Sequence, residues 1–211
     1  MLSENNTVLI LSPHTDDGEL GCGASIARFT AEGKQVYYAA FSLCQDSLPA
    51  NLPPDTLENE CRKATGMLDI DPSLVSFFNF PVRQFPAFRQ EILEELVTMN
   101  QKIKPGLVLI PSSNDRHQDH QVIHQEARRA FNKTSIAGYD LPWNNDQFRT
   151  DLFITLSEKH LEAKISAILA YRSQKDRNYM QPEFIRSLAT VRGLQAGSRY
   201  AEGFELYNWI V

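Results

Sequence analysis

The sequence predicts an α/β fold in which a mainly parallel sheet is flanked by helices. Short apolar runs alternate along the chain with segments whose apolar residues recur at helical spacing, a pattern typical of parallel strands joined by right-handed crossovers. The 211 residues, with 42% hydrophobic and 22% charged side chains, fit one globular domain. We therefore expect a Rossmann-like, doubly wound single domain over residues 1–211, with its first four strands in the order 3-2-1-4.

The first part of the chain, residues 1–132, supplies the regular core of this fold. Its expected strands are the apolar runs 7–12, 35–41, 74–80 and 107–111. Its expected helices, each with an apolar face, are 19–32, 55–67, 88–104 and 121–131. Gly33 is the expected C-cap of the first helix, and Asp55 with Glu58 predicts a capping box at the start of the second.

Residues 133–211 show a weaker pattern and are expected to elaborate the substrate cleft. Strands are expected at 136–139, 152–156 and 204–211, and helices at 157–171 and 182–192. A polar, aromatic loop, DLPWNNDQF, separates the first two of these strands. No repeat, low-complexity segment or linker interrupts the chain, so a second domain is not expected.

Charge and cysteine content narrow the expected partners and location. The formal net charge is −5 and no long run of lysine or arginine occurs, so neither nucleic acid nor an anionic membrane surface is the expected partner. A small polar substrate fits this charge better than either of these partners. The sequence leaves open whether the protein forms a homo-oligomer. Cys22, Cys44 and Cys61 lack C-x-x-C spacing, which predicts neither a disulfide framework nor a cysteine zinc site. The apolar run near the N-terminus is too short for a signal sequence or a membrane span, so we expect a cytoplasmic protein.

Two polar clusters follow the first and the fourth expected strand. The clusters are His14, Asp16 and Asp17 in HTDDGELGCG, and His117, Asp119 and His120 in DRHQDH. In the order 3-2-1-4 these two strands are neighbours and the chain reverses direction between them, which leaves a crevice at their carboxyl ends. The predicted topology therefore brings the two clusters together.

The residue types in these clusters indicate metal-dependent hydrolysis. Two imidazoles and one carboxylate on a single ion, with a position open for water, form a catalytic zinc site, and the same set accepts Fe²⁺. An adjacent carboxylate that is not a ligand serves as general base. Asp16 and Asp17 divide naturally into these two roles. Hydrolysis of an amide or an ester is the reaction class that follows.

The two motifs resemble the paired motifs of the LmbE-like, or PIG-L-like, zinc-dependent N-deacetylases, which remove acetyl groups from N-acetylglucosamine-type sugars. The resemblance covers about the first 130 residues, and YRSQ and YAEGFE are looser later landmarks. It implies that His14, Asp17 and His120 are metal ligands and that Asp16 is the general base. The sequence departs from the family pattern at Thr15, where proline is usual, and at Ala24, where glycine is usual.

The resemblance also implies roles for the remaining two residues of the second motif. His117 would be the imidazolium that stabilises the tetrahedral oxyanion and protonates the leaving amine. Asp119 would lie behind a histidine and fix its tautomer. Water activated by the metal would attack the acetyl carbon, so that acetate leaves from a free amino sugar.

Several residues outside the motifs are candidates for substrate binding. They are Arg83, Arg89, Trp143, Asn144, Tyr200 and Glu202. The two arginines would hold a phosphate or carboxylate of the substrate, or would form ordinary salt bridges. The tryptophan and asparagine would stack on and hydrogen-bond a sugar ring, although a core anchor is an equal expectation for the tryptophan. The tyrosine and glutamate would reach the cleft or act structurally.

Two alternatives to sugar deacetylation remain open from the sequence. One is a metal-dependent hydrolase of another amide or ester, and the other is a non-catalytic sugar-binding relative that keeps the fold. Asp16 argues against the second, because a binding module needs no base. His124 would share the metal with His120, one helical turn earlier, or would pack as an ordinary histidine, since the glutamate of an H-E-x-x-H motif is missing.

Overall fold

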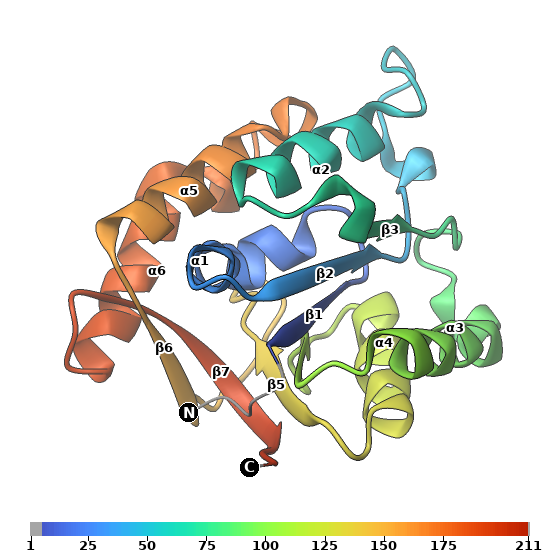
Figure 1. The fold of residues 1–211 in the computed structure, drawn as a ribbon. Coiled ribbons are helices and arrows are strands. Elements are labelled where there is room, and N and C mark those ends of the chain that lie inside the picture. The colour runs from blue at the N-terminus through green and yellow to red at the C-terminus, as the bar shows by residue number, and fades with distance from the viewer. Residues whose placement is uncertain (1–5, 211) are drawn as a thin grey trace.

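The computed structural model describes residues 6–210, and its sheet has seven strands in the order β3-β2-β1-β4-β5-β7-β6 (Figure 1). The strands are β1 Thr7–Ser12, β2 Gln35–Ala40, β3 Val75–Phe77, β4 Leu107–Pro111, β5 Ser135–Tyr139, β6 Leu152–Leu156 and β7 Tyr200–Asn208. Neighbouring strands from β3 to β5 are parallel, whereas β7 is antiparallel to both β5 and β6. The predicted order 3-2-1-4 is confirmed, and the later strands extend the sheet beyond β4.

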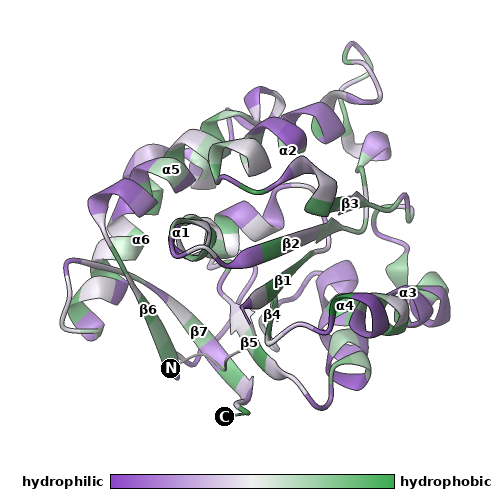
Figure 2. Ribbon diagram, viewed as in Figure 1, coloured by the Kyte–Doolittle hydropathy of each residue, from purple (hydrophilic) through white to green (hydrophobic). Residues whose placement is uncertain are grey.

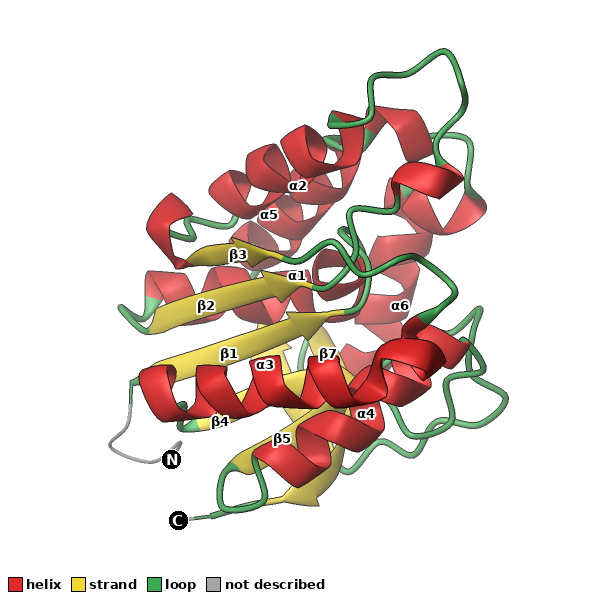
Figure 3. Cartoon of the chain, turned by 90° about the vertical axis from the view of Figure 1, so that its right-hand side faces the viewer, coloured by secondary structure: helices red, strands yellow, loops and turns green. Residues whose placement is uncertain are grey.

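Helices cover both faces of the sheet (Figures 1 and 3). One face carries α1 Asp17–Ala31, α2 Thr56–Met67, α5 Glu158–Leu169 and α6 Pro182–Gln195, and the other carries α3 Arg89–Ile103 and α4 Gln118–Ala130. Val8 and Ile10 of β1 pack into the core beneath α1, whereas Leu9 and Leu11 pack into the core beneath α3 and α4. This double burial explains why β1 is apolar throughout, and Figure 2 shows mainly hydrophobic strands at the centre of the sheet. None of the helices in residues 6–210 is long and apolar enough to cross a membrane.

Two predicted details at helix starts are wrong. α4 begins at Gln118, earlier than predicted, because His117 Nδ1 accepts a hydrogen bond from the Asp119 N–H at 3.2 Å and so caps the helix. The last two polar residues of the second motif therefore lie in the first helical turn. The capping box of α2 does not form, since the Asp55 carboxylate accepts a hydrogen bond from the Asn59 side chain and caps no backbone N–H.

α1 packs very closely on the sheet and is kinked where it does so. A Cβ atom on Gly21 would lie 2.2 Å from Cδ2 of Tyr139 in β5, so only glycine fits there. The helix breaks at Cys22, whose φ of −144° is not helical. The break frees backbone groups on either side of the kink, which need other partners.

A buried ion pair supplies those partners. The Lys164 Nζ atom donates to the Leu20 carbonyl at 2.7 Å, and the N–H groups of Ala24 and Ser25 donate to the Glu202 carboxylate at 3.2 and 2.7 Å. Lys164 Nζ lies 2.6 Å from Glu202 Oε1. The pair therefore fixes the first turns of α1, which follow directly on the β1 loop.

Candidate active site

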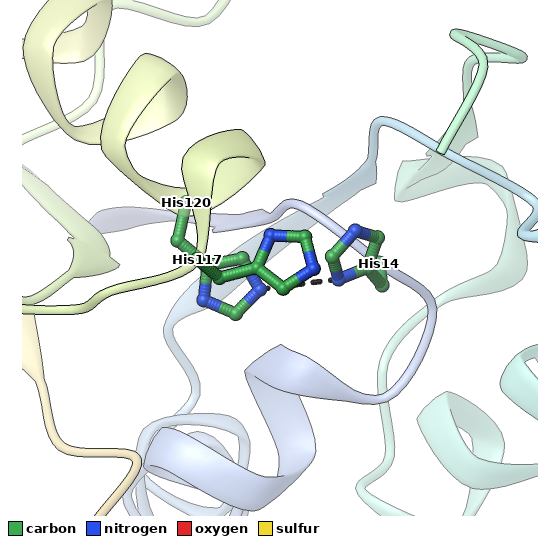
Figure 4. A group of neighbouring side chains, drawn as sticks. All are labelled: His14, His117 and His120. Carbon is green, nitrogen blue, oxygen red and sulfur yellow. Dashed lines mark hydrogen bonds between the residues drawn. The ribbon is translucent and has the colours of Figure 1, made fainter. Parts of the chain in front are cut away.

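The two polar clusters meet beyond the carboxyl ends of β1 and β4, which are neighbours in the sheet. His14 lies in the loop after β1, whereas His117 and His120 lie at the start of α4, and Figure 4 shows the three rings close together. Ring nitrogens of all three lie within 4.8 Å of one another. The topology thus joins His14 and His120 although they are 106 residues apart in sequence.

Asp17 completes a compact group with two of these histidines. Asp17 Oδ2 lies 3.1 Å from His14 Nδ1 and 3.1 Å from His120 Nε2, and the two nitrogens are 3.1 Å apart. The backbone N–H of His14 donates to the same Asp17 oxygen at 2.8 Å and holds that oxygen in place. We call His14, Asp17 and His120 the central triad.

A carboxylate lies behind each histidine of the central triad and fixes its tautomer. His14 Nε2 lies 3.0 Å from Asp119 Oδ2, and His120 Nδ1 lies 2.7 Å from Asp115 Oδ2. Because each of these nitrogens donates its proton to a carboxylate, the opposite nitrogen of the neutral ring has a lone pair that faces Asp17. When both rings are neutral, three acceptor atoms therefore converge on one point.

The central triad fits a divalent cation. Its two imidazole nitrogens and one carboxylate oxygen are donors that zinc and iron(II) accept. Burial lowers the pKa of His120, but the charge of Asp17 and the hydrogen bond to Asp115 outweigh burial and raise this pKa to about 10. Burial raises the pKa of Asp17, but the charges of His120 and His14 hold it well below its ordinary value. The triad therefore favours a bound positive charge, either a proton or a metal cation.

Asp16 lies beside the central triad without joining it. It is the N-cap residue of α1, but its carboxylate makes no capping hydrogen bond. Burial, followed by the charge of Asp17, raises the pKa of Asp16 to about 6. A half-buried carboxylate with this pKa is suited to accept a proton from water near neutral pH.

His117 differs from the expected imidazolium. Burial and the charges of His120 and His14 lower its pKa to about 4. Its Nδ1 atom accepts the Asp119 N–H, so the remaining ring proton is on Nε2. A lowered pKa favours the neutral ring, in which Nε2–H is a hydrogen-bond donor, whereas the resemblance implies a charged ring; the catalytic role of His117 stays a prediction.

A cleft of about 230 Å³ opens at the central triad. Of the predicted substrate-binding residues, Arg83, Trp143 and Asn144 line this cleft, as does Asp16. The Trp143 ring stacks on that of Tyr179, with centroids 4.1 Å apart and planes 9° apart. Trp143 and Tyr179 therefore form an aromatic part of the cleft wall, of the kind that packs on a sugar ring.

The other three predicted substrate residues do not line the cleft, and each has structural contacts instead. The Arg89 Nε atom donates to the buried Glu126 carboxylate at 2.9 Å, which joins α3 to α4. Tyr200 is buried in β7, a strand that begins before the predicted residue 204. Glu202 binds the kink of α1 and the Lys164 ammonium. Of the two roles expected for Arg89, Tyr200 and Glu202, the structure shows structural contacts, and it does not place these residues among those that line the cleft.

His124, which the sequence left open as a metal ligand, packs away from the central triad. Its Nδ1 atom lies 2.9 Å from the Pro111 carbonyl oxygen. Its ring lies edge-on to that of Tyr207, with centroids 5.0 Å apart. His124 is therefore a packed helical histidine.

A buried network supports the β1 loop from the side of α1. The Tyr171 hydroxyl lies 2.5 Å from the Thr15 carbonyl oxygen and 2.8 Å from Glu19 Oε1, and the Tyr38 hydroxyl also donates to Glu19. Burial raises the pKa of Glu19 to about 8, although both hydroxyls oppose the shift. The network fixes Thr15, the residue between the first histidine and Asp16.

Sequence reasoning missed three residues of the site. Asp115 accepts the His117 N–H at 2.8 Å, so an Asx turn just after β4 was a usable signal for it. Arg177 and Tyr179 line the cleft from the segment between α5 and α6. No local pattern marks these two, because only the packing of that segment brings them to the cleft.

Comparisons with known proteins identify a family and several proteins of similar fold. Residues 9–131 match the family model for PIG-L, described as GlcNAc-PI de-N-acetylase. A diacetylchitobiose deacetylase of Thermococcus kodakarensis is 27% identical over a match that covers 93% of this chain and 81% of that protein. The solved N,N'-diacetylchitobiose deacetylase of Pyrococcus horikoshii has a TM-score of 0.79 at 18% identity, covering 98% of this chain and 85% of that one. GalB, a 4-carboxy-2-hydroxymuconate hydratase of Pseudomonas putida, has the same TM-score of 0.79 at 20% identity and covers 97% of both chains.

The family match says more about the reaction of this chain than the similarity of fold does. The fold is shared by deacetylases and by a hydratase, so it does not identify the reaction. The family model spans more than half of the chain and both polar clusters, and it favours an enzyme over a non-catalytic relative. The chain therefore belongs to the PIG-L family of de-N-acetylases.

Proposed function

We propose that this chain is a metal-dependent hydrolase that removes the N-acetyl group from an N-acetylglucosamine-type sugar conjugate. The observation that carries the proposal is the convergence of the three atoms of the central triad at 3.1 Å, beside the Asp16 carboxylate, which makes no capping hydrogen bond. Family membership supports the reaction. The sugars named for the family and for the Thermococcus relative support the substrate class.

In this proposal the central triad holds the cation through His14 Nδ1, Asp17 Oδ2 and His120 Nε2. Zinc is the proposed ion, and iron(II) suits the same donor set. A divalent cation here supplies Lewis acidity, which polarises a carbonyl and acidifies water. Asp115 and Asp119 keep the two histidines in the tautomers that cation binding requires.

The chain's own residues would divide the proton transfers. Asp16, with its pKa near 6, accepts a proton from the attacking water. His117 Nε2–H donates a hydrogen bond to the carbonyl oxygen as negative charge develops there, an interaction commonly worth about 3 to 4 kcal/mol. The proton on Asp16 is then available for the leaving amine, so the products are acetate and a free amino sugar.

The substrate contacts in this proposal are Trp143 and Asn144 for the sugar and Arg83 for a further polar group. We propose that residues 1–211 form one domain. The segment after β5 supplies strands β6 and β7 of the sheet, and it also supplies part of the wall of the cleft. A cytoplasmic location is part of the proposal. It is supported by the three buried cysteines, which are all free thiols.

The test is the paired release of acetate and amine. Metal-depleted protein is reconstituted with zinc or iron(II) and incubated with N,N'-diacetylchitobiose, N-acetylglucosamine and an O-acetyl ester of glucose. We expect acetate and free amine in equal amounts from the amides, and no product from the chelated protein. Acetate from the ester alone, or no product from stoichiometrically loaded protein, would overturn the proposal.

A further inference from the structure

We propose that Gln174 binds a hydroxyl group of the sugar, and that Glu60 orients the Gln174 side chain for this contact through Ser173. Gln174 is the last residue of the YRSQ segment, residues 171–174, and it lines the cleft at the central triad. The inference rests on the proposed function, because it names a residue that holds the sugar from which the acetyl group is removed.

The YRSQ segment is held by two other parts of the chain. The Tyr171 hydroxyl lies 2.5 Å from the Thr15 carbonyl oxygen, in the loop after β1. The carboxylate of Glu60, in α2, accepts the Ser173 backbone N–H at 3.0 Å and the Ser173 hydroxyl at 2.6 Å. Gln174, the next residue, is therefore fixed relative to the loop that carries the first polar cluster.

A chain of hydrogen bonds determines which end of the Gln174 amide faces the protein. The Ser173 hydroxyl has one proton, and it donates this proton to the Glu60 carboxylate. The hydroxyl can then only accept a hydrogen bond from Gln174. The Gln174 atom that lies 3.0 Å from Ser173 Oγ is therefore the amide nitrogen Nε2, and the carbonyl oxygen Oε1 forms the other end of the amide.

Gln174 Oε1 is an unused acceptor that solvent reaches through the cleft. No group in residues 6–210 donates a hydrogen bond to it, yet the buried side-chain nitrogen and oxygen atoms without a partner in this part of the chain are Ser25 Oγ and Arg192 Nε. Oε1 is therefore not sealed in the core. Since Gln174 is only 8% exposed and lines the cleft, the cleft is where Oε1 is reached.

A sugar hydroxyl is the partner that this acceptor suits. A neutral amide oxygen binds a neutral donor, and hydroxyls are most of the donors that a sugar offers. The backbone carbonyl of Gln174 accepts the Arg177 N–H at 3.1 Å, which places the residue next to the segment that carries Tyr179 of the aromatic wall. A sugar packed on Trp143 and Tyr179 would direct its hydroxyls sideways along this wall. Because the amide is already held in one orientation, the contact costs little conformational entropy.

Deoxy sugars test the contact on the zinc-loaded protein. The substrates are the methyl glycoside of N-acetylglucosamine and its 3-deoxy, 4-deoxy and 6-deoxy analogues. We expect kcat/KM to fall about threefold to tenfold for the analogue that lacks the bound hydroxyl, as one neutral hydrogen bond provides. In Gln174→Met, which removes the amide at similar volume, that penalty should disappear. Penalties that Gln174→Met leaves unchanged for every analogue would overturn the inference.

A matched control separates lost binding from altered folding. Each penalty is a ratio between two substrates on one preparation, so the amount of folded protein cancels. Gln181→Met makes the same chemical change nearby, at a residue whose Nε2 donates to the Lys175 carbonyl at 2.8 Å and which does not line the cleft. Gln181→Met should keep the wild-type penalties.

Glu60→Gln and Ser173→Ala test the positioning role. In Glu60→Gln one acceptor of the carboxylate becomes a donor, which frees the Ser173 proton for Gln174 Oε1, and Ser173→Ala removes the link altogether. Both should raise KM for the parent glycoside and reduce the same deoxy penalty, whereas a purely structural role would lower stability and leave the penalty unchanged. The control is Glu58→Gln, on the same helix, whose carboxylate pairs with Arg62. An unchanged penalty in both test variants would overturn the role of Glu60.

Binding measurements separate failure of this inference from failure of the proposed function. The same glycosides are titrated into zinc-loaded Asp16→Asn protein, with and without Gln174→Met, and followed by ligand-observed NMR. A deoxy penalty in Kd that disappears in the Gln174 variant supports the inference even if no acetate is ever released, in which case only the proposed function fails. Acetate release with penalties that do not depend on Gln174 overturns the inference alone, and no measurable binding of any glycoside overturns both.

Discussion

The loops after β1 and β4 each direct one histidine at Asp17, yet the two histidines are held in different ways. His120 is held from within its own loop, by Asp115 five positions earlier, at 2.7 Å. His14 is held from the other loop, by Asp119, which is 105 positions away in sequence and 3.0 Å away in space. The β4 loop is therefore organised locally, whereas the β1 loop is completed only when the two strands are neighbours.

Asp119 also joins a third loop to this arrangement. Its Oδ2 atom accepts the Arg83 N–H at 2.6 Å, and its Oδ1 atom accepts the Phe85 N–H at 3.2 Å. One carboxylate thus links the β1 loop, the start of α4 and the segment before α3. Metal affinity should accordingly be more sensitive to loss of the Asp119 carboxylate, which joins distant segments, than to loss of the Asp115 carboxylate, which acts locally.

The largest effect is expected from His120→Ala, which removes the proposed metal ligand that Asp115 holds in place. Metal should no longer bind at one equivalent and acetate release should fall to background, as measured by elemental analysis and an acetate assay. The matched control is His124→Gln, one turn further along α4, which should keep both properties. Full metal content in His120→Ala would contradict the ligand assignment.

Asp16→Asn should have the next largest effect, because it leaves both histidine supports intact. We expect kcat to fall about 10² to 10⁴-fold, since the amide cannot accept a proton from water. Metal content, measured on the same preparation, should stay at the wild-type value. Turnover that survives the change would rule out Asp16 as the base.

The variants Asp119→Asn and Asp115→Asn compare how much each carboxylate contributes to metal affinity. Each should weaken metal affinity about 10 to 100-fold in a chelator competition, because each leaves one histidine without its carboxylate. Asp119→Asn should have the larger effect and should also lower the melting temperature, as it disturbs two backbone contacts of the third loop. A larger loss in Asp115→Asn would reverse the comparison.

Metal affinity should also depend on pH in a direction set by His120. In the metal-free chain its pKa is raised from 6.5 to about 10, so the ring keeps a proton that a cation must displace. Affinity should therefore rise with pH, by up to about tenfold per pH unit between these two values, with about one proton released. Calorimetry in buffers of different ionisation enthalpy measures this release. Affinity that does not change with pH would show that no proton competes.

The same shift affects the stability of the metal-free fold. A raised pKa in the folded state stabilises the fold fully below the unfolded value of 6.5, and this contribution is lost as the pH rises through about 10. Bound metal should remove the dependence, because it replaces the proton.

The smallest effect on catalysis is expected from Glu202→Gln, which lies outside both loops. The change leaves the buried Lys164 ammonium without its counter-charge, so the free energy of unfolding should fall by about 3 to 5 kcal/mol in denaturant titrations. KM of the folded fraction should not change. A raised KM with unchanged stability would restore the substrate role first expected for Glu202.

The sequence predicted the two polar clusters well because each follows an apolar strand directly. It left two roles open for Arg89 and Glu202, because a charged residue near the end of an element has the same local pattern whether it faces substrate or a structural partner. Their partners, Glu126 and Lys164, are 37 and 38 positions away. Such pairings depend on which helices pack together, and local periodicity does not encode that.

By itself, the sequence determined the α/β class, the order of the first four strands and the kinds of side chain at their ends. These features follow from apolar periodicity and from the handedness of crossovers, which act over short stretches of chain. Only the tertiary structure decided which carboxylate lies behind each histidine, that burial and the neighbouring histidines lower the pKa of His117, and that Arg177 and Tyr179 form a wall of the cleft. The reason is that hydrogen bonding and desolvation depend on ångström-scale distances between segments that are far apart in sequence.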